Sequence, residues 1–167
     1  LMIFAQKIHY KRLKQKHANA RDYLFRKYFD GEEVSSKTSS KFFFDAYIDI
    51  ETQITIEEVV RKRIIDDLEQ LRFTHKQFRR LNSLSPYKRR VAVFYIQTLN
   101  TKKAKTALEK RLKIEKNDSV RFYIIHALRD DLKATDFEFI LRTLSTSRES
   151  YPHWIYAILK NRYEVIK

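Results

Sequence analysis

A single glycine, Gly31, in a chain of 167 residues is the feature that most constrains the fold. Because other residues rarely take a positive φ without strain, tight hairpins and glycine-rich phosphate-binding loops are not expected. Nucleotide sites of the Rossmann, Walker and kinase types are therefore not expected either. The chain has no cysteine, which excludes disulfides, zinc–thiolate sites, iron–sulfur clusters and thiol catalysis. With only two prolines and 43% apolar residues, the composition predicts an all-α fold with a core of its own.

The formal charge of +14 is concentrated in two blocks. Residues 1–30 carry a net charge of +6 and residues 86–116 carry +8, whereas residues 31–68 between them carry −4. Such blocks favour polyanions as partners, either nucleic acid or an anionic membrane surface. The alternative interpretation is a solvated, lysine-rich surface that serves solubility.

The beginning of the chain resembles the cytoplasmic flank of a membrane helix. Five apolar residues, 1–5, are followed by five membrane-proximal basic residues, Lys7, Lys11, Arg12, Lys14 and Lys16. Because the chain begins with Leu1, one hypothesis is that an anchor precedes it and holds the protein at the inner face of the cell membrane, in the cytoplasm. The alternative is an amphipathic first helix whose apolar end packs on the domain.

The pattern predicts three parts along the chain. Residues 1–30 are expected to form a basic helix, which Gly31 ends in a left-handed C-terminal cap. Residues 31–41 form a polar loop rich in serine, and residues 42–167 an α-helical repeat domain. Within the last part, the spacing of Thr55 and Glu58 predicts a capping box, and the pair Thr135 and Glu138 predicts a second one. Further helix starts are predicted from N-caps at Ser85, Thr101 and Asp118.

The helices from residue 85 onward repeat at a constant interval. Aligning Arg89 with Arg121 also aligns Ile96 with Leu128, an offset of 32 residues. A last helix, 152–166, places Leu159 31 residues after Leu128. Helix pairs at such a period indicate a solenoid, in which no pair buries its apolar face alone.

This pattern resembles the HEAT-repeat superfamily over about residues 69–166. The matching positions of one repeat are Asp118, Val120, Arg121, Ala127 and Leu128. The turns lack the glycines common in that family, and Pro152 stands where the last repeat would have its arginine, so that repeat is expected to be a C-terminal cap. The resemblance implies a short right-handed superhelix, a scaffold that binds through its concave face without catalysis. It also implies a structural, inter-repeat role for three residues, Arg89, Arg121 and Asp118.

Candidate catalytic and metal-binding residues are few. The five histidines, His9, His17, His75, His126 and His153, have no metal-ligand spacing. Asp45 and Asp49 share a helix face, which suits a cation or acid–base chemistry, but an exposed polar stripe is the alternative. Serine nucleophile motifs of the GxSxG type require glycines that are absent. We therefore expect no catalytic residue, no metal and no cofactor.

The sharpest functional candidates are basic residues at two helix starts. Lys88 and Arg90 begin one helix, Lys102 and Lys103 begin the next, and the four are predicted to bind an anionic partner at one edge of the stack. The neighbouring aromatic residues are interpreted as core, with stacking on bases as the alternative; they are Phe94, Tyr95, Phe122, Tyr123, Trp154 and Tyr156. The sequence thus predicts a non-enzymatic scaffold that binds a protein partner, with an anionic membrane surface as a further candidate partner. Nonspecific nucleic-acid binding is the alternative function.

Overall fold

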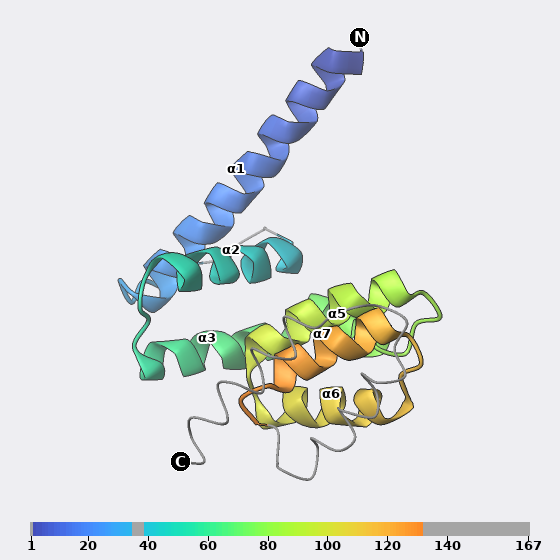
Figure 1. Cartoon of the computed structure of the whole chain (residues 1–167). Coiled ribbons are helices and arrows are strands. Elements are labelled where there is room, and N and C mark those ends of the chain that lie inside the picture. Colours follow the sequence, from blue (N-terminus) through green and yellow to red (C-terminus); the bar gives the residue numbers. More distant parts are fainter. Residues whose placement is uncertain (1, 35–38, 132–167) are drawn as a thin grey trace. The chain divides into compact units, whose positions relative to one another are not determined.

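The computed structural model describes residues 2–34 and 39–131. Over these residues the chain is helical and contains no strand, which confirms the predicted all-α class (Figure 1). The chain divides into two compact units, Leu1–Lys76 and Gln77–Lys167, which we call the N-terminal unit and the C-terminal unit.

The N-terminal unit is built on helix α1 (Met2–Tyr28), which contacts both α2 (Ser40–Gln53) and α3 (Glu58–Gln70). The buried side chains of α1, among those that the structure describes, lie in its second half. Its buried residues recur every four positions, so they form one stripe along the helix. The buried apolar residues of the three helices are Ala20, Leu24, Tyr28, Phe44, Ala46, Tyr47, Ile50, Ile64, Ile65 and Leu68.

The first half of α1 carries the basic segment. Residues 9–16 are all exposed, and they include the predicted membrane-proximal residues Lys11, Arg12, Lys14 and Lys16; Lys7 lies earlier in the same helix. Among the described residues, no helix combines the length and the apolar character needed to cross a membrane. The helix ends as predicted, because Gly31 takes a φ of 72° and the Glu32 N–H donates to the Arg26 carbonyl at 2.9 Å.

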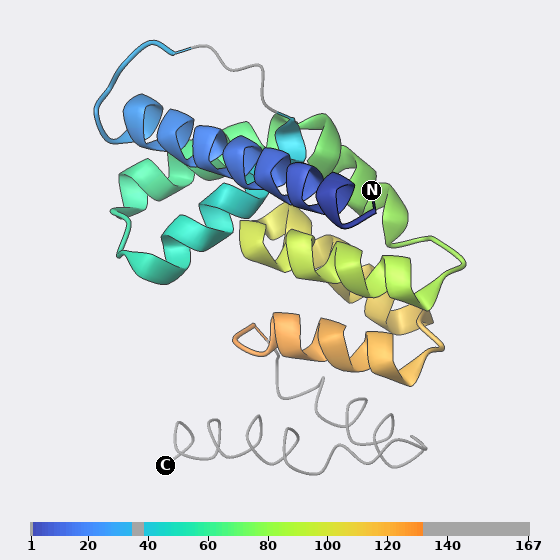
Figure 2. The same cartoon turned by 90° about the horizontal axis from the view of Figure 1, so that it is seen from above.

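The C-terminal unit begins within α4 (Arg72–Arg80) and continues through α5 (Pro86–Leu99), α6 (Lys102–Ile114) and α7 (Asp118–Leu128). Helix α5 contacts both α6 and α7, and α6 contacts α7. Figure 2 shows α5 and α7 side by side. The 32-residue interval is reflected in burial, because three pairs of corresponding positions on α5 and α7 are buried. The pairs are Ala92 with Ile124, Val93 with Ile125, and Ile96 with Leu128.

The structure confirms two predicted helix caps and corrects two others. The side chains of Ser85 and Thr101 accept hydrogen bonds from the first turns of α5 and α6. Asp118 is the first residue of α7 rather than its cap; Asn117 is the cap, and its side chain accepts from the Val120 N–H at 3.1 Å. An N-cap side chain accepts from an N–H two or three residues later in the chain. Asn117, one residue before Asp118, is at that distance from the Val120 N–H and has the helix-starting backbone of a cap.

The predicted capping box before α3 is also wrong. Helix α3 begins at Glu58, so the residue at the N-cap is Glu57, and its side chain makes no capping hydrogen bond. Thr55 lies two residues too early in the chain to reach the orphan N–H groups of the first turn.

Replacing Asn117 by alanine is expected to destabilise the chain by about 1 kcal/mol, because the first turn of α7 loses the acceptor for the Val120 N–H. Asp118→Ala is the matched control: it removes a partly exposed carboxylate that pairs with Arg121 at 3.5 Å, and it should cost about half as much or less. Urea denaturation of the two variants measures the difference. A larger loss for Asp118→Ala would show that the cap is misplaced.

Two further differences concern the course of the chain. Helix α4 was not expected as a separate element; the chain bends at Leu71, which separates it from α3. Residues 42–76 belong to the same compact unit as α1, not to the repeat domain expected from residue 42, because α1 packs on α2 and α3 across the polar loop. Several predictions lie outside the described residues: the capping box of Thr135 and Glu138, the helix 152–166 with Leu159, and the residues Pro152, His153, Trp154 and Tyr156.

Candidate anionic-partner interface

A buried carboxylate, Glu115, organises the end of the C-terminal unit at which α5 and α7 begin and α6 ends. Arg89 of α5 binds it with two hydrogen bonds, from Nε to Oε2 at 2.7 Å and from Nη2 to Oε1 at 2.8 Å. Arg111 of α6 adds a bond from Nε to Oε2 at 2.9 Å. The N–H groups of Lys116 and Asn117 donate to Oε1 at 3.0 and 2.9 Å. Each oxygen therefore has at least two donors, which compensates the burial of the charge.

Arg89 extends this network to the loop before α5. Its Nη1 donates to the carbonyl of Ser83 at 2.7 Å and to that of Leu84 at 2.9 Å. The side chain of Arg89 is 8% exposed and that of Glu115 is fully buried. Arg89 thus ties the loop at 83–84 to the end of α6, and it is unable to meet an external partner.

The network fixes the charge state of Glu115. Burial alone raises the pKa of this carboxyl, but the hydrogen bonds from Arg89, from the Asn117 N–H and from Arg111 outweigh burial, and the pKa lies below its ordinary value. Since the pKa is lower in the folded chain than in the unfolded chain, the carboxylate stabilises the fold at neutral pH. This contribution is lost as the pH falls below the ordinary glutamate value and through the folded-state pKa.

The other predicted structural residues also lie at this end. Arg121 donates from Nε to the Glu115 carbonyl and pairs with Asp118, one turn earlier in α7. Arg90, predicted as a binding residue, is half-buried: its Nη1 donates to Ser119 Oγ at 3.3 Å and its guanidinium lies 5.9 Å from the centre of the Tyr123 ring. Arg90 therefore joins α5 to α7.

The structure does not place the four predicted binding residues at one edge. Helices α5 and α6 run in opposite directions, since the start of α5 is bonded to Glu115 at the end of α6. Lys102 and Lys103 open α6, about 20 Å from Glu115 along the helix axis. Both are exposed, and the ammonium of Lys103 lies 5.1 Å from the centre of the Phe78 ring. Lys88 therefore lies at one end of the helices, and Lys102 and Lys103 lie at the other.

Three exposed lysines remain at the Glu115 end. Lys88, Lys113 and Lys116 make no ion pair with any residue that the structure describes. The same two segments, 84–88 and 113–116, also expose three large apolar side chains, namely Leu84 (99%), Tyr87 (67%) and Ile114 (62%). We call these six residues the loop edge. The buried network holds it in place, because Arg89 binds the Leu84 carbonyl on one side and Glu115, the neighbour of Ile114, on the other.

The candidate acid–base residues face basic partners instead of a shared site. Asp45 accepts a hydrogen bond from Lys41, and Asp49 pairs with Arg21 at 3.3 Å. His126 is half-buried; burial, and then the charge of Arg129, lowers its pKa. In the part of the chain that the structure describes, no group of three or more histidine, aspartate or glutamate side chains could hold a metal ion.

Sequence reasoning missed Glu115, Lys113 and Lys116. The signal for Glu115 is weak but present: it is an acid that follows a helix with arginine four residues earlier. The two lysines follow from the polarity of α6, whose C-terminal end meets the start of α5. Comparison with protein-family models, with curated proteins and with solved structures finds no match for this chain.

Proposed function

We propose that the chain is a non-enzymatic interaction scaffold whose loop edge binds an acidic segment of a protein partner. The observation that carries the proposal is that segments 84–88 and 113–116, which the buried Arg89–Glu115 pair joins, both expose lysines and large apolar side chains. Exposed apolar side chains that lie together mark interaction sites, and the surrounding lysines select a partner of negative charge.

The repeat supports the same proposal. Helices α5 and α7 pack with a 32-residue register, and helical repeats of the HEAT-like kind act as scaffolds by presenting an extended surface. Under this proposal the module is cytoplasmic, and the exposed lysines and arginine in the first half of α1 face an anionic membrane surface. The described carboxylates named above are paired with cations, which fits a role without acid–base chemistry.

The second candidate is nonspecific nucleic-acid binding, which the charge of +14 and the exposed Tyr87 ring favour. Two features favour the acidic protein segment. The loop edge offers three lysines without ion-pair partners among the described residues rather than a continuous basic track. Contacts with a charged phosphate backbone would not bury the exposed apolar side chains of Leu84 and Ile114.

A titration at about 0.15 M salt separates these functions. The probes are a labelled peptide that alternates glutamate with leucine, a second peptide with serine in place of leucine, duplex and single-stranded oligonucleotides, and vesicles of phosphatidylserine and phosphatidylcholine. We expect the leucine-containing peptide to bind about tenfold more tightly than the serine peptide, because the leucines cover the exposed apolar side chains. Tighter binding of the oligonucleotides or the vesicles than of either peptide would contradict the proposal.

A further inference from the structure

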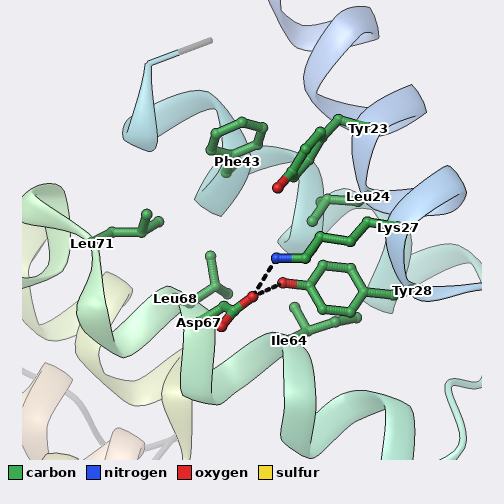
Figure 3. A pocket seen from close by; sticks show the side chains of 9 residues that line it. All are labelled: Tyr23, Leu24, Lys27, Tyr28, Phe43, Ile64, Asp67, Leu68 and Leu71. Atoms are coloured by element: carbon green, nitrogen blue, oxygen red, sulfur yellow. Dashed lines mark hydrogen bonds and ion pairs between the residues drawn. The ribbon is translucent and has the colours of Figure 1, made fainter. Parts of the chain in front are cut away.

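The N-terminal unit contains a cavity that the proposed function does not use. Helices α1, α2 and α3, with Leu71 directly after α3, line a half-open pocket of about 160 Å³ (Figure 3). The rings of Tyr23 and Phe43 lie on one side, with their centres 4.8 Å apart. The remaining apolar lining consists of Leu24, Ile64, Leu68 and Leu71.

The size of the cavity selects its occupant. An engineered apolar cavity of about 150 Å³ in another protein stays dry and binds benzene. A space of this volume between two aromatic rings and four aliphatic side chains therefore suits one six-membered ring. A larger ring system would extend out of the pocket, and a single water molecule would find few polar partners along the apolar part of the wall.

One wall of the cavity is polar. Oδ2 of Asp67 accepts from Lys27 Nζ at 2.6 Å and from the Tyr28 hydroxyl at 2.5 Å, and Figure 3 shows these three side chains meeting at one side of the pocket. Burial opposes both charges, yet the mutual hydrogen bonds outweigh it: the pKa of Lys27 lies above its ordinary value and that of Asp67 lies below. The wall thus keeps an ammonium and a carboxylate whose charges cancel.

A ligand for this wall is neutral and carries a hydrogen-bond acceptor. The Lys27 ammonium has three N–H donors; one goes to Asp67 and a second faces the Tyr28 hydroxyl, so one donor remains for a ligand. A charged ligand would have to compete with the existing Lys27–Asp67 pair, whereas a hydroxyl would not. A hydroxyl can accept from Lys27 and also donate to the Tyr23 oxygen.

We propose that this cavity binds a small neutral phenol, with its ring between Tyr23, Phe43 and Leu71 and its hydroxyl on the Lys27 ammonium. The phenol is either a free small molecule or the tyrosine side chain of a partner. The two sources share the same chemistry and differ in whether a peptide backbone follows the ring.

The test titrates the full chain with p-cresol, with toluene and with N-acetyltyrosine amide, and follows amide chemical shifts. We expect p-cresol to bind at least about tenfold more tightly than toluene, which has the same shape without the hydroxyl. Binding of the tyrosine amide as tight as that of p-cresol would assign the site to a partner's tyrosine, and binding of p-cresol alone would assign it to a free ligand.

Two variants locate the site. Leu71→Trp fills the cavity and should abolish binding of both rings. Lys27→Met combined with Asp67→Asn keeps the shape of the wall without its charges. This double variant should bind toluene as the unmodified chain does, and it should bind p-cresol about as tightly as toluene. The proposal is overturned if neither ring binds, if p-cresol and toluene bind the unmodified chain equally, or if the double variant keeps the preference. Thermal melting of each variant verifies that it folds.

Discussion

Replacing Glu115 by alanine is expected to destabilise the chain by about 3–5 kcal/mol. The substitution leaves two guanidinium groups without their carboxylate, and both are largely buried: the side chain of Arg89 is 8% exposed and that of Arg111 is 15% exposed. It also removes the acceptor for the N–H groups of Lys116 and Asn117 at the start of α7. Unpaired buried charges and donors are among the most costly changes a fold can suffer.

The control is Glu109→Ala, which removes an exposed glutamate from α6, the helix that Glu115 follows, and should change the free energy of unfolding by about 0.5 kcal/mol or less. The double variant Arg89→Met/Glu115→Leu should recover part of the loss, because it removes the unpaired charge of Arg89, whereas Arg111 and the two N–H groups still lack their acceptor. Urea denaturation measures all three. Equal stability of the two single glutamate variants would show that the Glu115 network does not hold the loop edge.

Arg121→Ala is expected to cost less than Glu115→Ala. The Arg121 side chain is 25% exposed, and it binds the Glu115 carbonyl and the partly exposed Asp118, so water can replace much of what it loses. Arg89 and Arg121 are equivalent in the 32-residue interval, but Arg89 is the more buried of the two.

The helical class and most helices could be predicted because local signals determine them. Each of these signals affects residues close to it in the chain. They are the scarcity of glycine, the caps at Ser85 and Thr101, and the apolar stripes along the helices. The 32-residue interval also correctly paired Ile96 with Leu128 among the buried positions of α5 and α7. Cap positions were less secure, since a shift of one residue separates Asn117 from Asp118 and both are good caps.

The candidate site could be predicted only in part, because it depends on contacts between distant residues. Arg89 and Glu115 are 26 residues apart, and Lys27 and Asp67 are 40 apart. A sequence pattern records that Lys88 and Lys102 both open helices, but it does not record that the two helices run in opposite directions. This is why Lys102 and Lys103 were grouped with Lys88, whereas Lys113 and Lys116 were not.

The position of the interface, as distinct from the overall charge, is the central claim. Two double variants test it: Lys88→Glu/Lys116→Glu at the loop edge, and Lys102→Glu/Lys103→Glu at the other end of α6. Both pairs are exposed, and both variants lower the net charge by the same amount. Exposed charges contribute little to stability, so both variants should fold.

The most direct measurement is the affinity of these two variants for the leucine-containing acidic peptide, at one salt concentration. We expect the loop-edge variant to bind about a hundredfold more weakly than the unmodified chain. Each charge reversal replaces an attraction by a repulsion and weakens the binding free energy by about 1.4 kcal/mol, which is a factor of about ten in affinity. The Lys102/Lys103 variant should stay within about threefold of the unmodified chain. Equal losses in the two variants would show that only the net charge attracts the peptide, and would contradict a defined interface at the loop edge.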